Sequence, residues 1–226
     1  MTHPLAADLC AGAAAMGLAL SDMQVTQLLA YQDLIQKWTK VYNLTAVRDP
    51  AEMLTHHLLD SLAVLLPLQQ QLAALRTSGA LAADVPVRLL DVGSGAGLPG
   101  AVIAICCPQV TVHCVDTVAK KAAFIQQVAA SLKLPNLRGI HARVEKLTER
   151  YDIVSSRAFA SLVDFVSWSA QALAEKGVWM AMKGKHPAEE IAVLPATVRV
   201  FHVEPLVVPG LVAERCIVWM AQTASV

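Results

Sequence analysis

The sequence has no hydrophobic run long enough to cross a membrane. Its longest apolar stretches, such as Val87–Leu90 and Gly100–Cys107, end well short of the roughly 18 consecutive apolar residues that a membrane span requires. The N-terminal stretch MTHPLAADLC carries Asp8 and lacks the positively charged start of a secretory signal. We therefore expect a cytoplasmic globular protein with no membrane contact.

The chain also lacks paired cysteines and an excess of charge of one sign. Its 5 cysteines form no CxxC pair, so we expect reduced, buried thiols, with neither disulfides nor a metal site. Eighteen Lys and Arg balance 18 Asp and Glu, so the whole molecule has no strong field to attract nucleic acid. Any contact with RNA must therefore come from a local basic patch.

The first 80 residues have helical patterns and predict an N-terminal helical extension. Ser21 and Gln24 form a capping box ahead of apolar residues at helical spacing, which continue as far as Trp38. A second helix start lies at Asp49 and Pro50, and the pattern after it continues to Pro67.

A small, polar stretch at residues 76–86 follows the helical pattern and reads as a junction between the two parts of the chain. Residues 1–80 are then the extension, packed on a core domain at 85–226.

The core domain has the pattern of an α/β fold. Short β-branched runs alternate with helical segments, which is typical of a mostly parallel sheet with helices on both faces. Seven strands are predicted, at residues 87–92, 110–116, 137–142, 151–156, 177–184, 198–206 and 215–221.

A glycine-rich loop, DVGSGAGLPG, follows the first strand directly. A strand, a glycine turn and a helix in this order bring a ligand close to main-chain N–H groups at the carboxyl end of the strand. The loop satisfies GxGxxG, which alone is weak evidence for a dinucleotide. Asp91, two residues before Gly93, would repel a pyrophosphate and attract a cation such as the sulfonium or ammonium of S-adenosylmethionine.

Asp116 ends the second strand, where a carboxylate can accept hydrogen bonds from both hydroxyls of a ribose. Taken singly, each acid has an ordinary structural reading: Asp91 caps a loop, and Asp116 caps the helix that follows it. Together, at the ends of neighbouring strands, they favour a site for S-adenosylmethionine.

Six separated motifs then resemble one family over about residues 20–220. They are YNLTAVRDPAEMLTHHLLDSL, LLDVGSGAGLPG, VDTVAKKAAFI, ARVEKL, YDIVSSRAFASL and MKGK. In order and spacing they resemble the RsmG family of bacterial small-subunit rRNA methyltransferases, formerly called glucose-inhibited division protein B.

The resemblance implies a Rossmann-like class I fold dependent on S-adenosylmethionine. It also implies methyl transfer to N7 of one guanine of 16S rRNA, guanine 527 of the helix-18 loop. The family's cofactor site carries over to Gly93, Leu98, Val144, Glu145 and Arg157. With the acids and glycines above, the expected cofactor residues are Asp91, Gly93, Gly95, Gly97, Leu98, Asp116, Val144, Glu145 and Arg157.

One departure from the family is visible at His56, which stands where the family usually has arginine; His57 matches. A phosphate contact from this helix is thereby in doubt. A local pair between His56 and Asp60, four residues apart, is the structural alternative.

The chemistry needs no catalytic base, because guanine N7 has an in-plane lone pair and no proton to lose. Alignment of the reactants can supply most of the acceleration. Arg157, where the fourth strand ends, is the expected positioning residue, with the cofactor carboxylate, guanine O6 or a phosphate as its partner. A structural salt bridge to Glu145 or Asp152 is the alternative reading.

The expected RNA contacts are basic or polar residues near the same edge of the sheet. They are Asn43, His57, Lys120, Lys121, Arg143, Lys183 and Lys185, with Arg48 as a further candidate. Asn43 has a turn-stabilising alternative, and each lysine taken singly reads as a solvated surface residue.

Three other functions stay open on the sequence. A methyltransferase acting on a small molecule is the main alternative; a non-catalytic binding module and an NAD-dependent reductase are weaker, the latter because no Tyr-x-x-x-Lys pair is present. The expected partner is 16S rRNA, free, in the small subunit or in an assembly intermediate. We expect a monomer, because an RNA-facing cleft needs an open edge.

Overall fold

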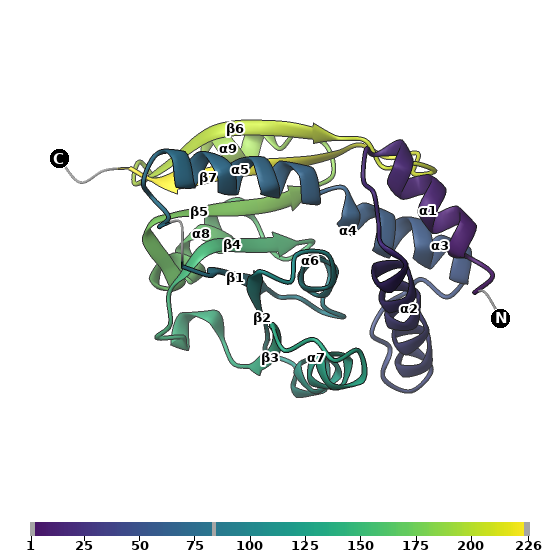
Figure 1. Cartoon of the computed structure of the whole chain (residues 1–226). Helices are drawn as coiled ribbons and strands as arrows, with labels where there is room; N and C mark the ends of the chain where they lie inside the picture. The colour runs from purple at the N-terminus through teal and green to yellow at the C-terminus, as the bar shows by residue number, and fades with distance from the viewer. Residues whose placement is uncertain (1–2, 83–84, 224–226) are drawn as a thin grey trace.

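Seven strands form one sheet in the order β3-β2-β1-β4-β5-β7-β6 in the computed structural model, which describes residues 3–82 and 85–223 (Figure 1). The strands are β1 Val87–Val92, β2 Val110–Asp116, β3 Leu137–His141, β4 Tyr151–Arg157, β5 Leu173–Lys183, β6 Val198–Leu206 and β7 Arg215–Gln222. The pairs from β3 to β5 are parallel, and β7 is antiparallel to both β5 and β6.

The predicted strands are confirmed to within one residue at each end, except that β5 begins four residues earlier than predicted, at Leu173. Side chains alternate between the two faces of the sheet, as the period of a strand requires. Leu89 belongs to the core on one face and Leu90 to the core on the other.

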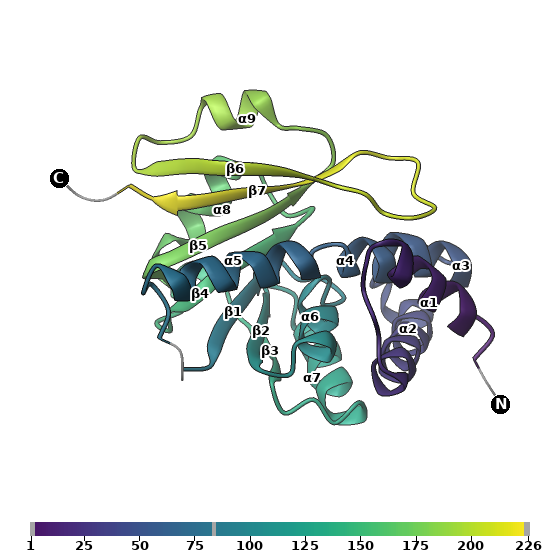
Figure 2. The ribbon, with the colours of Figure 1, turned by 45° about the horizontal axis from the view of Figure 1, so that its top comes forward.

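Helices cover both faces, which confirms the α/β prediction. Helix α6, Gly100–Cys106, follows β1, and α7, Ala119–Ser131, follows β2; their buried side chains belong to the larger core. Helix α8, Leu162–Ser169, covers the smaller core on the opposite face together with the 3₁₀ turns η2, Val144–Lys146, and η3, Ala170–Ala172. The short α9, Ala188–Ala192, lies beside β6 (Figure 2).

The N-terminal part is helical, as predicted. It comprises α1 Ala6–Ala15, α2 Asp22–Tyr42, α3 Pro50–Met53, the π-helical turn η1 Leu54–Leu59, α4 Asp60–Leu62 and α5 Leu65–Thr77. The capping box of Ser21 and Gln24 is present at the start of α2, and Asp49 caps α3. Helix α2 continues past Trp38 to Tyr42 and ends at Asn43, which has a left-handed backbone.

The prediction that the helical pattern after Asp49 and Pro50 ends at Pro67 is wrong. Pro67 lies in the first turn of α5, where its missing N–H has no intrahelical partner to lose, and the helix runs on to Thr77. The predicted junction at 76–86 therefore begins inside α5, and residues 83–84 of it lie outside the described residues.

The helical run Pro50–Thr77 is long and apolar enough to qualify as a candidate membrane span, and 61% of its most apolar window is buried inside the fold. The run is interrupted by η1 and by a turn at Ala63 and Val64. Its buried residues, among them Leu58, Leu62 and Leu68, belong to the same core as Leu89 of β1. Packing against the sheet therefore accounts for its composition.

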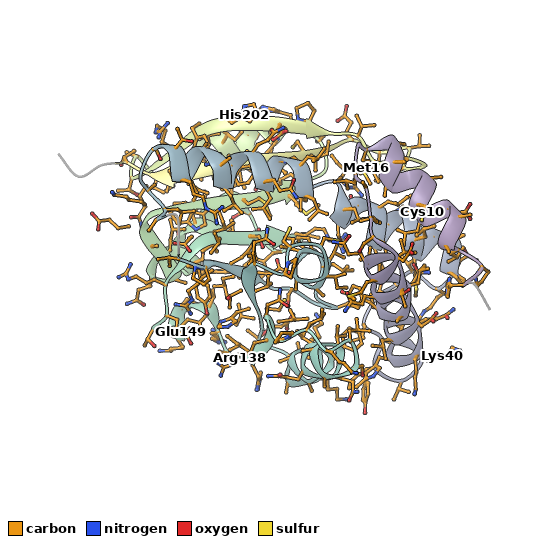
Figure 3. All side chains as sticks on the ribbon, viewed as in Figure 1. Cys10, Met16, Lys40, Arg138, Glu149 and His202 are labelled. Atoms are coloured by element: carbon orange, nitrogen blue, oxygen red, sulfur yellow. The ribbon has the colours of Figure 1, made fainter. Side chains whose placement is uncertain are left out.

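Helices α1 to α4 of the extension lie at the carboxyl ends of the parallel strands, whereas α5 runs back along the sheet (Figure 1). The arrowheads of β4 and β5 point toward the end of the sheet where α4 lies, and α1, α2 and α3 gather beyond it (Figure 1). Side chains fill the layers between the helices and the sheet, while labelled Cys10 and Lys40 are on the outer side of α1 and α2 (Figure 3). The extension and the core domain therefore share one hydrophobic core, and they meet at the edge where ligands bind in folds of this kind.

Candidate functional site

The glycine loop needs a backbone that only glycine adopts easily. Gly93, Gly95 and Gly97 have φ angles of 65°, 59° and 90°. At Gly93 a Cβ atom would also lie 2.1 Å from Cδ2 of Phe159. Gly93 therefore leaves room for the Phe159 ring, directly above the end of β1.

Asp91 lies beneath this loop and does not reach the cavity. Its side chain is 0% exposed, and its two oxygens accept hydrogen bonds from the Gly100 N–H at 3.0 Å and from Ser155 Oγ at 2.9 Å. Burial raises the pKa of Asp91 to about 6, against the effect of these hydrogen bonds. The expectation that its carboxylate faces a cationic ligand is thus wrong here, and the loop-capping alternative describes its contacts.

Asp116 is placed as expected, at the end of β2 and on the wall of a cavity. Its Oδ2 accepts a hydrogen bond from Gly95 N–H at 3.1 Å, and its Oδ1 accepts one from Val118 N–H at 2.8 Å. Lys121 Nζ lies 3.7 Å from Oδ2. Since a carboxylate oxygen can accept two hydrogen bonds, Asp116 retains acceptor capacity toward the cavity.

The first cavity has a volume of about 390 Å³ and lies over the carboxyl ends of β1, β2 and β4. Four expected cofactor residues line it, namely Gly93, Asp116, Val144 and Glu145. Lys121 and Arg143, expected to contact RNA, line this same cavity instead.

Two aromatic residues that line this cavity were not predicted from the sequence. Phe159 and Trp168 form an edge-to-face pair with ring centroids 5.8 Å apart, and both are partly exposed. Phe159 lies within the motif YDIVSSRAFASL but had no role assigned to it, and Trp168 lies outside the six motifs, so only the cavity lining reveals both.

Three other expected cofactor residues do not line the cavity. Gly95 donates its N–H to Asp116; a Cβ atom at Gly97 would lie 2.4 Å from Cδ1 of Ile125; and Leu98 is buried in the core. They shape the loop from below, because helices α2 and α7 pack against it there. Tyr31 of α2 donates a hydrogen bond from its hydroxyl to the Ala96 carbonyl at 2.6 Å.

Arg157 lines a second cavity, of about 370 Å³, that shares Ala158 with the first. Its Nη1 donates to Asp60 Oδ2 at 2.7 Å and to the His56 carbonyl at 3.1 Å. The structural partner is therefore Asp60, from the extension, and the alternative reading of a salt bridge to Glu145 or Asp152 is wrong. The alternative pair of His56 and Asp60 is also wrong, because Asp60 instead binds Arg157 and Arg215.

His57 lines this second cavity and is 7% exposed. Its Nε2 is hydrogen-bonded to Thr45 Oγ1 at 2.9 Å, whereas its Nδ1 is buried without a partner among the described residues. Burial lowers the pKa of His57 to about 4, so the ring is neutral at pH 7.

The remaining expected RNA residues are separated from one another. Lys183 also lines the second cavity, but its Nζ binds Glu190 at 2.8 Å and the Ala160 carbonyl at 3.0 Å. Lys120 lies over the ring of Tyr42, and Lys185 is exposed. Asn43 accepts a hydrogen bond from Arg48 at 2.7 Å and ends α2, as its turn-stabilising alternative requires.

The strand order, the glycine loop after β1 and the acid at the end of β2 define a class I methyltransferase fold, whose cofactor is S-adenosylmethionine. The cavity fits that group, because its volume is within the range of about 300–1,000 Å³ typical of small-molecule sites and Asp116 offers acceptors for a ribose.

Two solved structures share this fold. They are TrmN from Thermus thermophilus, with a TM-score of 0.53 and 17% identity over 75% of this chain and 53% of that chain, and the ribosomal protein L11 methylase from Lactobacillus delbrueckii subsp. bulgaricus, with a TM-score of 0.50 and 15% identity over 69% of this chain and 78% of that chain.

The chain belongs to the family described as rRNA small subunit methyltransferase G, whose model matches residues 24–218. Ribosomal RNA small subunit methyltransferase G of Albidiferax ferrireducens is 68% identical over 213 residues, which are 94% of this chain and 95% of that protein. The protein of the same name from a Polaromonas species is 69% identical over 94% of this chain and 92% of its own length. The family resemblance seen in the motifs is thereby confirmed.

Proposed function

We propose that this protein transfers the methyl group of S-adenosylmethionine to N7 of a guanine in 16S rRNA, guanine 527 of the helix-18 loop. Membership of the family named for rRNA methylation supports this substrate class. The single observation that carries the proposal is the pair of adjoining cavities. Asp116 lines the first, and Arg157, Lys183 and Arg215 line the second.

In this arrangement the cofactor lies in the first cavity, with Asp116 accepting hydrogen bonds from the ribose hydroxyls. Val144 and Glu145 lie on the wall beyond β3, where they would hold the adenine. Gly93 lets the chain approach the cofactor closely, while Asp91 holds the loop through the Gly100 N–H. Lys121 and Arg143, at the same cavity, are available to the cofactor carboxylate or to an RNA phosphate.

The second cavity receives the target nucleotide. The bound cofactor supplies an electrophilic methyl group on a positive sulfur, and the N7 lone pair forms the new bond as the bond to sulfur breaks. No side chain has to remove a proton. This suits the residues present, because burial lowers the pKa of His57 to about 4 and both oxygens of Asp60 already accept hydrogen bonds from arginines.

The acceleration then comes from alignment of N7 with the methyl group, which contributes up to about 7–11 kcal/mol in favourable intramolecular cases. Arg157, at the junction of the two cavities, is the positioning residue. Exposed Lys120 and Lys185 contribute to RNA binding from outside the cavities. The protein acts as a monomer in the cytoplasm, on the small subunit or an assembly intermediate.

The test uses methyl-labelled S-adenosylmethionine with three separate acceptors: small subunits lacking the modification, naked 16S rRNA and a pool of small molecules. Chemical cleavage at 7-methylguanine locates the label. We expect one labelled guanine in helix 18. Label in small molecules alone would refute the rRNA substrate and favour the main alternative, a small-molecule methyltransferase.

Asp116→Ala tests the assignment of the cofactor site. Because it removes the acceptors at the end of β2, it should weaken S-adenosylmethionine binding by at least tenfold in calorimetry while RNA binding persists. Equal cofactor affinity in the variant and the wild type would contradict the assignment of the first cavity.

A further inference from the structure

Asp60 joins three distant parts of the chain at the second cavity. It lies in α4 and is bound by Arg157 Nη1 from the end of β4 at 2.7 Å and by Arg215 Nε from the start of β7 at 2.8 Å. Its side chain is 3% exposed, whereas those of Arg157 and Arg215 are 17% and 24% exposed. The carboxylate is therefore buried between two guanidinium groups that reach the cavity.

The two arginines are not saturated by these contacts. Arg215 Nη1 donates to the Glu214 carbonyl and Arg157 Nη1 to the His56 carbonyl, but Nη2 of each arginine has no hydrogen bond within residues 3–82 and 85–223. A guanidinium has 5 N–H donors, so both keep free donors beside the cavity. One carboxylate between two guanidinium groups also leaves one net positive charge.

The rest of the cavity wall adds a neutral polar side chain, that of His57, but no further net charge. Lys183 is neutralised by Glu190, and His57 is neutral. The His57 side chain is more than nine-tenths buried, and its Nδ1 is without a partner among the described residues. His57 thus contributes a neutral polar side chain to this wall and no charge.

We propose that this cavity binds a backbone phosphate of the target nucleotide, with Arg157 and Arg215 as its donors and Asp60 as the residue that positions both. The single negative charge of a phosphodiester matches the net charge of the three residues. The inference rests on the proposed function and assigns this site a ligand within the RNA. Recognition of the base by these arginines fits less well, because a guanidinium on the guanine edge binds O6 and N7 together and would block the atom to be methylated.

The experiment measures binding of the full-length protein to small subunits lacking the modification, with S-adenosylhomocysteine present so that no reaction occurs. Dissociation constants are taken over a range of salt concentrations. Arg215→Gln should weaken binding roughly tenfold and reduce the slope of log affinity against log salt by about 1, because one phosphate contact is lost. Arg215→Lys should keep the slope, since the charge is kept, and bind with intermediate affinity.

The control is Arg199→Gln, which removes an exposed arginine near the start of β6. Arg199 is seven residues along β6 from Leu206, the residue paired with Arg215, and so lies roughly 23 Å from it. This variant should bind small subunits like the wild type. Cofactor affinity, measured by calorimetry, checks that each variant is folded.

Three results would overturn the proposal. Wild-type affinity and slope in Arg215→Gln would refute the phosphate contact while leaving the rRNA methyltransferase intact. Loss of cofactor binding in both Arg215 variants would assign the arginine to the fold. Failure of the wild type to bind and methylate small subunits would instead refute the proposed function, and this inference with it.

Asp60→Asn tests positioning separately, since it keeps the shape and removes the charge that holds the two arginines. The salt slope should be preserved, because both arginines remain, while kcat for methylation falls roughly tenfold as their alignment is lost. Wild-type kcat in a variant that retains cofactor binding would show that Asp60 does not position them.

Discussion

Asp91 and Gly93 are two residues apart, yet they belong to different environments. The carboxylate of Asp91 points into the core and binds the Gly100 N–H, whereas Gly93 faces the cavity under Phe159. The motif identified the loop correctly, but the sequence did not reveal which of its side chains point toward the ligand. In the structure the carboxylate of Asp116 lies on the cavity wall, and that of Asp91 supports the loop.

Replacing Gly93 with alanine should weaken cofactor binding. The backbone there has φ 65°, which costs a residue with a Cβ atom about 1–2 kcal/mol, and the new methyl group would collide with Phe159. We expect at least a tenfold loss of S-adenosylmethionine affinity in calorimetry. Gly79→Ala is the matched control, because φ is 70° there but nothing lies within 4 Å of the added Cβ. Equal effects of both substitutions on affinity would exclude the steric contribution.

Asp91 should make stability depend on pH in an unusual direction. Its pKa in the fold is about 6, above the ordinary value of 3.8, so the folded state holds the proton more tightly than the unfolded state. The resulting stabilisation is complete below about pH 4 and is lost as pH rises through 6, by up to about 3 kcal/mol.

Asp91→Asn cannot lose a proton, so the difference in unfolding free energy between variant and wild type should shift in favour of the variant between pH 4 and pH 7. Urea unfolding at several pH values measures it. His57 acts in the opposite direction, since its pKa of about 4 removes stability as pH falls below 6.5. A pH-independent difference between Asp91→Asn and the wild type would refute a titrating Asp91.

At the scale of elements, α2 is more than a cover for the sheet. Tyr31 on this helix is fully buried, stacks near Phe124 of α7 and holds the glycine loop through the Ala96 carbonyl. The hydrophobic spacing of α2 predicted the helix, but nothing in the sequence linked its tyrosine to a loop 65 residues away.

Tyr31→Phe should therefore lower both stability and cofactor affinity. The substitution leaves the buried Ala96 carbonyl without its donor, at a cost of about 1–3 kcal/mol. Thermal unfolding and calorimetric titration with S-adenosylmethionine measure the two effects. Tyr42→Phe, at the exposed end of the same helix, should change stability by less than about 0.5 kcal/mol. Should Tyr31→Phe behave like Tyr42→Phe, the loop would not depend on α2.

At the scale of the whole molecule, the extension and the sheet should unfold together. Leu28 of α2 and Leu68 of α5 belong to the same core as Leu89 of β1 and Trp219 of β7. Removing residues 1–80 would expose that core, so residues 85–226 should aggregate when produced alone.

The measurement is denaturant unfolding of the full chain, followed by tryptophan fluorescence and far-ultraviolet circular dichroism. Coincident transitions are expected, as for one cooperative unit. Two separated transitions, or a folded core domain without the extension, would show two independent domains.

The sequence alone determined the seven strands, the glycine loop and the family. These features are local: alternation of apolar residues, a capping box and glycines at fixed spacing depend on neighbours in the chain. The position of the site at the ends of β1, β2 and β4 could also be predicted, because the carboxyl ends of parallel strands meet at one edge of a sheet.

Only the tertiary structure decided which side chains meet at that edge. Asp60, Arg157 and Arg215 come from the extension, the middle strand and the last strand, and their pairing depends on how the extension packs across the sheet. Contacts between residues so far apart carry no local periodicity, so the salt bridges that the sequence offered as structural alternatives for Arg157 and Asp60 were wrong. Buried charges must be paired when the core closes, and the fold brings these three together.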